Sequence, residues 1–564
     1  MSALDAKQGV TYSQFACIGS GISAIALGAT LKRWYGITDV RFFERHDDLG
    51  GTWFANTYPG CACDVPSILY SFSFAPNPKW TQTLPSSAEL LTYLKHVADK
   101  YNLSSKMTFG AQVIRCEWMA QTRRWRLHVR RVKDGSVLVH DCQFLYSGTG
   151  VLVHPREPDM PGIKSFRGPV FSAARWRSDV DLRDKSVALV GNGCTAAQIV
   201  PNITTAQLTQ YIRSKHWIVP PIQVPNTKLM QWVFEHIPGS MALVRFIVFC
   251  SAESDWKGFL MNEKGATYRM EREARAAKYI RATAPEKYHQ LLIPDFEIGC
   301  RRRIYDPGYL RALHDSNITL TDDPIVEVLP DAIRTKSGTV TKTDVIVLAN
   351  GYNTNQFLPD VEVIGRDGVT LEKHWSSFGG PEAYNCCALN EFPNFFMLLG
   401  PNTATGHQST IMAIENAVNY SLRVIKPILD GDATALEVKP EAEIEYSQKL
   451  QGAMQNTVWL GNCHAWYTKE TANGKWNSMT YPFSQGHYWY TCLFPRYKDW
   501  NYTMVRNSSQ RKLWRTLHKA FAWLAILLLG LLVGLSVRGR SDIIHQVTPL
   551  VTRSWQSLKQ RKSS

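Results

Sequence analysis

The sequence of 564 residues predicts an α/β fold, and three observations lead to this prediction. A short apolar strand, a glycine turn and a helix follow one another at residues 12–35 and again at residues 186–201. Residues 225–295 are instead rich in Met, Trp, Phe and charged residues at helical spacing, and residues 520–537 form an uninterrupted apolar run. The expected fold class is two Rossmann-like dinucleotide-binding domains with a helical insertion and a C-terminal transmembrane helix.

The two glycine turns are the strongest local signals. Tyr12 to Ile18 leads into Gly19-Ser-Gly21-Ile-Ser-Ala24, and Ser186 to Val190 leads into Gly191-Asn-Gly193-Cys-Thr-Ala196. Glycine makes such a turn without strain, and the helix that follows offers N–H groups and a positive dipole end to a pyrophosphate. One GxGxxA motif is a weak signal, but two in the same strand–turn–helix context predict two bound dinucleotides.

The residue at the end of each unit's second strand indicates which ribose the unit accepts. Glu44 lies 23 residues beyond Gly21, and a carboxylate there can accept both hydroxyls of the unphosphorylated ribose of FAD. Arg213 lies 20 residues beyond Gly193, and the run Tyr-Ile-Arg-Ser-Lys around it has two cations and no acid. This suits the 2′-phosphate of NADPH. The alternative is that Arg213 is a solvated cation at a strand end.

A third strand, Thr343 to Leu348, is followed by Ala349-Asn350-Gly351 and is expected to return the chain to the first domain. The helical insertion is expected to cover an active site. The predicted order is an FAD-binding domain (residues 10–155, continued at 341–505) around an NADPH-binding domain at residues 165–340, whose insertion spans about residues 225–295. A transmembrane helix at residues 520–537 and a basic tail at residues 541–564 follow.

The net charge of +15 belongs mainly to the end of the chain, where eleven Lys and Arg face one acid, Asp542, from residue 505 onward. This distribution argues against a nucleic-acid binder. The basic residues flank Ala520 to Val537, an apolar run of 18 positions, which as a helix measures about 27 Å and matches a bilayer's hydrocarbon core. A buried packing helix is the alternative, although such a helix normally keeps a polar face.

The N-terminus MSALDAKQGVTYSQF has no secretory apolar core. With its one predicted span near the C-terminus, the protein is expected to be a single-pass, tail-anchored membrane protein of the endoplasmic reticulum with a cytosolic catalytic body. The cysteines show no paired spacing typical of a metal site, and no metal is expected.

Several motifs along residues 10–500 closely resemble the Baeyer–Villiger monooxygenases, flavoproteins that use FAD and NADPH. The matching stretches are Gly50-Gly51-Thr52-Trp53, Tyr58-Pro59-Gly60 with Asp64, Phe-Glu-Ile-Gly299-Cys300-Arg301-Arg302, Ala349-Asn350-Gly351, Gly400-Pro401-Asn402 and Cys463-His464-Ala465-Trp466-Tyr467. The stretch GNGCTAAQ and the C-terminal span are more similar to fungal secondary-metabolite members.

One position departs from the family's FxGxxxHxxxW motif. Phe166, Gly168 and Trp176 are in register, but the histidine position holds Ser172. Serine keeps a hydrogen-bonding group and loses the ring that titrates near neutral pH. This puts in doubt the choice of reaction more than the fold or the cofactors.

The resemblance assigns catalysis to Arg302, a cation that stabilises negative charge on oxygen, and to Asp64, which positions this arginine and the nicotinamide. It assigns Arg301, in place of the usual lysine, to the NADPH phosphate, and Trp466 to packing near NADP. The alternative for residues 301–303 is a solvated basic turn, and for Asp64 a turn-forming role. Motifs and resemblance together predict these cofactor contacts: Gly19, Gly21, Ala24, Glu44, Gly51, Thr52, Trp53, Tyr58, Asp64, Gly191, Gly193, Thr195, Gln198, Arg213, Ser214, Arg301 and Trp466.

The expected reaction is insertion of one oxygen atom from O2 next to a ketone carbonyl, giving an ester or lactone, in secondary metabolite biosynthesis. The aromatic residues of the helical insertion suggest a bulky apolar ketone, although a large core uses the same residues. Two alternatives stay open: hydroxylation at nitrogen or sulfur in the same fold, and an NADPH oxidase that releases hydrogen peroxide.

Overall fold

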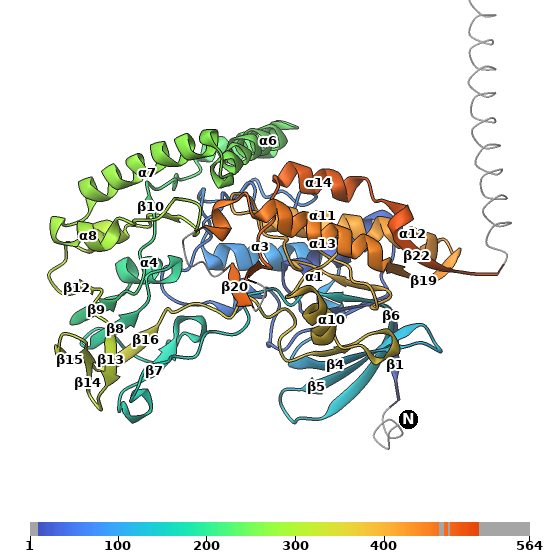
Figure 1. Cartoon of the computed structure of the whole chain (residues 1–564), viewed down its shortest axis with the longest axis horizontal. Helices are drawn as coiled ribbons and strands as arrows, with labels where there is room; N and C mark the ends of the chain where they lie inside the picture. The colour runs from blue at the N-terminus through green and yellow to red at the C-terminus, as the bar shows by residue number, and fades with distance from the viewer. Residues whose placement is uncertain (1–8, 462–466, 472–473, 507–564) are drawn as a thin grey trace, which may run out of the picture. The chain divides into compact units, whose positions relative to one another are not determined.

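The computed structural model describes residues 9–461, 467–471 and 474–506 (Figure 1). Its larger sheet has the strand order β17-β4-β5-β6-β1-β2-β3, with β18 paired to β6. The strands are β1 (Thr11–Ile18), β2 (Val40–Phe43), β3 (Met107–Thr108), β4 (Ala111–Met119), β5 (Arg124–Arg131), β6 (Val137–Ser147), β17 (Glu362–Ile364) and β18 (Phe395–Met397). Strand β1 is parallel to both β2 and β6, so the carboxyl ends of these strands meet at one edge.

A second sheet has five parallel strands in the order β12-β9-β8-β16-β7. They are β7 (Val170–Ser172), β8 (Ser186–Val190), β9 (Gln207–Tyr211), β12 (Ile318–Thr321) and β16 (Val345–Leu348). Each sheet buries its own cluster of apolar side chains. The two glycine-turn units therefore belong to two separate parallel arrangements, as the sequence predicts.

The strand predicted at Thr343 to Leu348 forms, but it does not return the chain to the first sheet. Strand β16 lies between β8 and β7 of the second sheet, and all four of its residues are buried there. The predicted boundary at residue 341 is therefore wrong for this strand. The chain crosses back after β16, where Tyr352 forms a bridge with Pro155 and the Gly351 carbonyl accepts from the Arg156 N–H at 2.9 Å.

The helices follow the sequence pattern closely in the first unit. Helix α1 (Ile22–Tyr35) buries Ser23 to Leu31 and ends at Gly36, whose φ of 67° allows its N–H to bond back to Lys32 and Leu31. The remaining helices are α2 (Thr52–Ala55), α3 (Ser87–Lys100), α4 (Cys194–Ile199), α5 (Lys228–His236), α6 (Ser240–Glu253), α7 (Glu263–Thr283), α8 (His289–Leu292), α9 (Tyr309–Ala312), α10 (Leu371–Phe378), α11 (Thr410–Val424), α12 (Lys426–Leu429), α13 (Pro440–Met454) and α14 (Gln485–Leu493).

The segment predicted as a helical insertion contains α5, α6, α7 and α8. Short strands complete the described chain: β10 (Ile218–Val219), β11 (Ile304–Tyr305), β13 (Ile325–Val328), β14 (Ala332–Thr335), β15 (Val340–Lys342), β19 (Ala433–Val438), β20 (Thr468–Thr471), β21 (Gly474–Asn477) and β22 (Trp500–Met504). The described residues group into a large body, within residues 9–426 and 435–501, and a small group at residues 427–434 and 502–506.

The predicted membrane helix at residues 520–537 and the basic tail at residues 541–564 lie outside the described residues. Within the described part, no single helix has the length and apolar composition to cross a bilayer. One pair of segments, Lys228–His236 and Ser240–Phe259, passes this test together, but the two are bent by 112° relative to each other.

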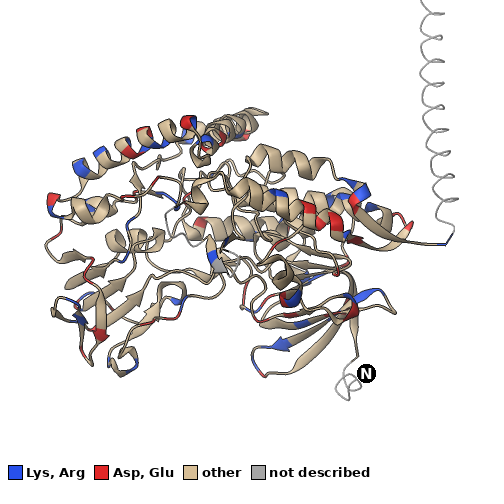
Figure 2. Ribbon diagram, viewed as in Figure 1, with Lys and Arg blue, Asp and Glu red and all other residues tan. Residues whose placement is uncertain are grey.

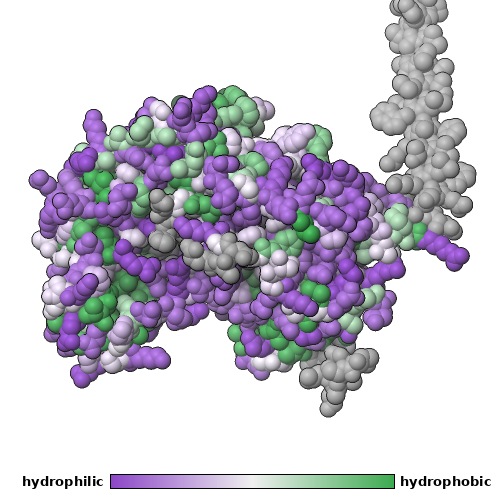
Figure 3. All heavy atoms as spheres, viewed as in Figure 1, coloured by the Kyte–Doolittle hydropathy of each residue, from purple (hydrophilic) through white to green (hydrophobic). Residues whose placement is uncertain are grey.

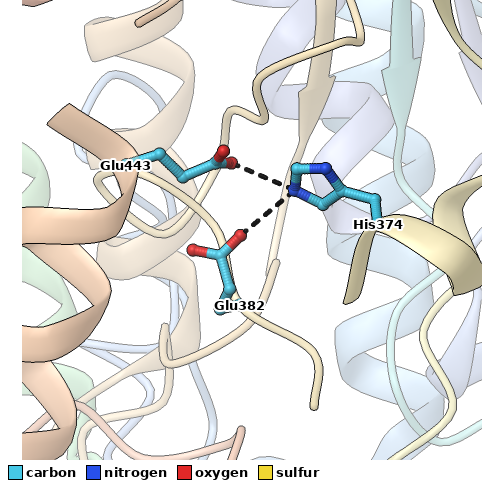
Figure 4. A group of neighbouring side chains, drawn as sticks. All are labelled: His374, Glu382 and Glu443. Carbon is cyan, nitrogen blue, oxygen red and sulfur yellow. Dashed lines mark ion pairs between the residues drawn. The ribbon is translucent and has the colours of Figure 1, made fainter. Parts of the chain in front are cut away.

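A group of charged side chains is buried beside α10 and α13, where His374, Glu382 and Glu443 point toward one another (Figure 4). His374 Nε2 lies 3.3 Å from Glu443 Oε1 and 3.5 Å from Glu382 Oε1, and His374 Nδ1 lies 3.0 Å from Glu391 Oε2. Burial alone lowers the pKa of His374, but these carboxyl groups outweigh burial and raise it to about 10. Burial, assisted by Glu443, raises the pKa of Glu382 to about 8. A protonated His374 and a protonated Glu382 thus let two carboxyl groups share one buried site.

Replacing Glu382 by Gln is expected to stabilise the protein at alkaline pH relative to the native chain. The folded pKa of Glu382, about 8, lies above the ordinary value of 4.5, so its stabilising contribution is complete below pH 4.5 and is lost as the pH rises through 8. The amide does not titrate. The unfolding free energy of E382Q minus that of the native protein should therefore increase by about 2–3 kcal/mol between about pH 6 and about pH 8 and level off above this range, as thermal melts at each pH would measure.

The control is E372Q, since Glu372 is an exposed residue on α10, the helix that carries His374. Its melting temperature should track that of the native protein at every pH. A difference between E382Q and native protein that stays constant over the range would contradict a protonated Glu382.

Candidate active site

A cavity of about 1570 Å³ opens where the carboxyl ends of strands from both sheets meet. Its walls include Gly19 after β1, Glu44 after β2, Gly191 after β8 and Ala349 after β16. Parallel sheets bind ligands at this edge, beyond the ends of the strands. The cavity exceeds the ~300–1,000 Å³ of a pocket for one drug-sized ligand, so it has room for more than one molecule.

The first glycine turn forms a close-fitting cradle at the start of α1. Gly19 has a φ of +101°, and a Cβ there would lie 2.8 Å from the Gly148 carbonyl oxygen. Gly51 has a φ of +55°, and its Cβ would lie 3.2 Å from the Cα of Gly21. Larger residues would fill the space through which the backbone approaches a pyrophosphate, so the turn fits a dinucleotide.

Glu44 lies beside this cradle, as predicted. Its Oε2 accepts from the backbone N–H of Ser20 at 2.9 Å and from the Ser20 hydroxyl at 3.0 Å, and its Oε1 accepts from the His46 N–H at 2.9 Å. These bonds fix the carboxylate in the cavity wall. Each oxygen keeps capacity to accept a further hydrogen bond from a ribose hydroxyl.

The second glycine turn packs tightly on β16. Gly191 has a φ of +136°, and a Cβ there would lie 2.2 Å from the Ala349 carbonyl oxygen. Helix α4 starts at Gly193 without a side-chain cap. Its Gln198 accepts from the Tyr58 hydroxyl at 2.9 Å and donates to the Ala62 carbonyl at 3.0 Å, which ties the loop after α2 to the second unit.

Two cations, Arg213 after β9 and Arg301, line the same cavity. Arg301 Nη1 donates to the Lys215 carbonyl at 3.2 Å, and its guanidinium lies 4.8 Å from the centre of the Phe296 ring. Burial, and then the charge of Arg213, lower the pKa of Arg301. A bound anion between these two guanidinium groups would relieve their repulsion, as a 2′-phosphate does. Ser214 is held nearby, since its carbonyl accepts from Asn192 at 3.0 Å.

Arg302 and Asp64 form a two-bonded ion pair in the cavity wall. Arg302 Nε donates to Asp64 Oδ2 at 2.5 Å and Arg302 Nη2 donates to Asp64 Oδ1 at 2.6 Å. Burial alone raises the pKa of Asp64, but Arg302 outweighs it and holds this pKa below its ordinary value. Asp64 raises the pKa of Arg302 in turn. About a third of each side chain stays exposed to the cavity, so the pair is charged and accessible.

The structure brings nearly all the predicted contacts together around one cavity. The lining includes Gly19, Gly21, Glu44, Gly51, Thr52, Trp53, Tyr58, Asp64, Gly191, Gly193, Thr195, Gln198, Arg213, Ser214, Arg301 and Arg302. Ala24 is the exception, because it is fully buried within α1, where a small residue lets the helix pack closely. Trp466 lies outside the described residues.

His216 and Tyr467 are two of the cavity residues that were not predicted as cofactor contacts. His216 is close to Arg301, and burial together with that charge lowers its pKa to about 4, so its ring is neutral at pH 7. Tyr467 also lines the cavity and is buried. In the sequence, His216 is a lone histidine in a basic run, and only the three-dimensional structure shows that it lines the cavity.

Ser172, which replaces the family's motif histidine, has a local structural role. It ends β7, and its hydroxyl accepts from the Ala174 N–H at 3.2 Å, capping a short turn at Ala173–Arg175. Ala174 and Arg175 line the cavity, whereas Ser172 is not among its described lining residues. The turn at Ala173–Arg175 is therefore held without an imidazole ring.

The cavity has two glycine cradles, with an acid beside the first and two cations beside the second. These features define an oxidoreductase that holds two dinucleotides around an accessible Arg–Asp pair. Comparisons narrow this class. Residues 17–85 match the NAD(P)-binding Rossmann-like domain model, and residues 69–235 match the L-lysine 6-monooxygenase/L-ornithine 5-monooxygenase model.

Curated relatives match over most of their length. A Baeyer–Villiger monooxygenase of Streptomyces coelicolor is 35% identical over 83% of this chain and 88% of its own. One from Pseudomonas aeruginosa is 32% identical over 86% and 91% of the two chains. The FAD-binding monooxygenase tazF of Aspergillus terreus is 30% identical over 84% and 86%. The chain belongs to the Baeyer–Villiger monooxygenase family and is a flavin-dependent monooxygenase that uses FAD and NADPH.

Solved structures agree on the fold. An oxidised steroid monooxygenase bound to NADP superposes with a TM-score of 0.75 at 25% identity. Cyclohexanone monooxygenase from Rhodococcus sp. Phi1, bound to NADP+, gives a TM-score of 0.77 at 24% identity. Each comparison covers 88% of this chain and 100% of the other.

Proposed function

We propose that this monooxygenase inserts one oxygen atom next to the carbonyl of a bulky apolar ketone, with Arg302 and Asp64 as its catalytic residues. The observation that carries the proposal is the two-bonded Arg302–Asp64 pair, accessible in the wall of the shared cavity. Oxygen insertion next to a ketone develops negative charge on oxygen, and a fixed cation in a cavity shielded from water stabilises such charge strongly.

Arg302 and Asp64 have different roles in the proposed reaction. When bound, FAD and NADPH supply electrons and activate O2. Arg302 supplies a permanent positive charge at the reacting centre, since its pKa is raised far above any working pH. Asp64 orients the guanidinium through both of its oxygens, so the cation is in place before reaction. Its carboxylate stays ionised because Arg302 lowers its pKa.

The cofactor contacts follow the two cradles. We propose that Gly19, Gly21 and Glu44 hold the FAD pyrophosphate and ribose. Gly191 and Gly193 would hold the NADPH pyrophosphate, and Arg213 with Arg301 its 2′-phosphate. The position of both arginines in the cavity lining supports this assignment, because a doubly charged phosphate would offset the repulsion that Arg213 exerts on Arg301.

Heteroatom hydroxylation is the second candidate. It is favoured by the match of residues 69–235 to the lysine and ornithine N-monooxygenase model and by Ser172 at the motif histidine position. Mass spectrometry of products decides: a ketone that gains one oxygen as an ester supports insertion, an amine or sulfide that gains one supports hydroxylation, and hydrogen peroxide alone indicates an oxidase.

We also propose that residues 520–537 anchor the enzyme in the endoplasmic reticulum membrane, with the catalytic body in the cytosol. The run has 18 apolar positions between basic clusters, which suit lipid headgroups on both sides.

Truncation after Asn507 is expected to release the enzyme from membranes while keeping FAD bound and activity intact. The full chain should sediment with membranes through high salt and carbonate, and only detergent should release it, because no charge interrupts the apolar run. The measurement is fractionation of both forms with flavin absorbance. A truncated protein that aggregates and loses FAD would mean that the run packs within the enzyme itself.

A further inference from the structure

Helices α5 and α6 present an apolar surface that the described body leaves uncovered. Neither helix contains a buried residue. Along α6, Leu243, Phe246, Ile247 and Cys250 follow at intervals of three and four residues, so they share one face. Leu243, Phe246 and Ile247 are 60%, 62% and 56% exposed. Such a continuous apolar stripe normally faces a protein core.

Helix α5 contacts α6 and extends the surface. Its Leu229 is 71% exposed and its Trp232 is 52% exposed. We call the exposed set the apolar platform: Leu229, Trp232, Leu243, Phe246 and Ile247. Figure 3 shows hydrophobic atoms gathered over α6. Exposed apolar groups of this kind mark interaction sites rather than ordinary surface.

The charges of α6 point away from the platform. Arg245 and Glu253 are its charged residues, whereas charged residues follow one another along α7 (Figure 2). Arg245 Nη1 donates to the Ile68 carbonyl at 2.6 Å and to the Ser71 carbonyl at 3.0 Å. The helix therefore turns its polar side to the body and its apolar side outward.

The same helix is fixed to the wall of the active-site cavity. Gln408 lines the cavity, and its Nε2 donates to the Phe249 carbonyl of α6 at 3.0 Å and to Glu253 Oε2 at 3.2 Å. Glu253 also lies 3.0 Å from His407 Nε2 and accepts from the Gly486 N–H at 2.8 Å. One layer of side chains thus separates the platform's helix from the cavity.

We infer that the apolar platform inserts into the interfacial layer of a lipid bilayer and that apolar substrate reaches the cavity from the membrane along α6. The inference rests on the proposed C-terminal anchor. Thirteen residues separate Arg506 from Ala520, which span at most about 45 Å when extended, so an anchored body stays at the bilayer surface. The bend of 112° between the two segments is incompatible with one straight span, and two amphipathic segments lying in the membrane plane can accommodate such a bend.

Two other occupants fit the platform less well. The apolar run at residues 520–537 is apolar on all sides, so packing one face on α6 would leave the others exposed to water. A second copy of the chain would cover the platform symmetrically, and the experiment below detects it.

The experiment places a nitroxide spin label on Cys250, the exposed cysteine of the described chain, in full-length protein reconstituted into phosphatidylcholine vesicles. Label bound elsewhere is subtracted with C250S. The reference site is V340C in the C250S background, because Val340 is 53% exposed on β15, away from the platform. Collisions with a water-soluble nickel chelate should be several-fold fewer at Cys250 than at the reference site, and collisions with O2 more frequent.

The outcomes are distinct. Equal chelate collisions at both sites, in protein that floats with the vesicles, would contradict insertion of the platform into the bilayer but would agree with the C-terminal anchor. Protein that does not float at all would overturn the anchor. Dipolar broadening at Cys250 that disappears on dilution with unlabelled protein would assign the platform to a second copy. The variant L243D/F246D should still float with the vesicles through the anchor, and chelate collisions at Cys250 should rise. The control V326D, an apolar-to-acid change on β13, should also float and should leave the collisions at Cys250 as few as in the native protein.

Discussion

Replacing Arg302 by Ala is expected to abolish oxygenated product while FAD stays bound. Arg302 is the cation paired with Asp64 in the cavity wall, and its side chain remains about a third exposed to that cavity. Loss of one preorganised charge costs about 10²–10³ in rate. NADPH oxidation should continue, with the electrons recovered as hydrogen peroxide. Product, peroxide and flavin absorbance are measured on the same sample.

Two further variants separate charge from geometry. R302K keeps the positive charge but cannot make two parallel bonds to Asp64, so it should retain part of the product yield. The double variant R302A/D64N removes the carboxylate that R302A leaves without its partner, and it should be as inactive as R302A but bind FAD normally. Normal product formation by R302A would show that another cation serves the reaction.

The glycine-turn units could be predicted because their signals are local. An apolar strand, two glycines and an Ala-rich helix occupy consecutive positions, and β1 with α1 matches the predicted limits within a residue or two. The pairing of Glu44 with the first turn and Arg213 with the second also follows from spacing along the chain, since the next strand of a parallel unit ends at the same edge.

Strand β16 shows what local signals lack. Its four apolar residues identify a buried strand, but not whether it joins the first or the second sheet. That choice depends on pairing with β7, about 175 residues earlier, and with β8. The buried His374 cluster could not be predicted for the same reason, because Glu382 and Glu443 come from segments far apart in the sequence.

The Arg302–Asp64 pair was predicted from motifs that a sequence cannot connect by itself. The two residues are 238 positions apart, and the resemblance alone placed them together. For Ser172, the sequence shows only that the motif histidine is replaced. The structure adds what the serine does: its hydroxyl caps the turn that lines the cavity.

Replacing Arg213 by Glu is expected to reverse the preference for NADPH over NADH. Native protein should bleach anaerobically faster with NADPH, because Arg213 and Arg301 together would bind the 2′-phosphate. A charged hydrogen bond to phosphate contributes about 1.5–3 kcal/mol, so R213A should lose roughly 10–100-fold in preference. R213E loses more, since its carboxylate repels the phosphate and pairs with Arg301 instead. The rates of flavin bleaching with each nucleotide measure the effect.

The matched control is R183E, which makes the same charge change on the exposed Arg183 before β8, paired with Asp181 and outside the cavity lining of the described chain. Its preference should equal that of the native protein, because a surface charge far from the phosphate is screened by salt. Equal bleaching rates with NADPH and NADH in the native protein would refute the role of Arg213. An R213E variant that slows with both nucleotides alike would instead mean that this arginine supports the fold of the second glycine turn rather than reading the phosphate.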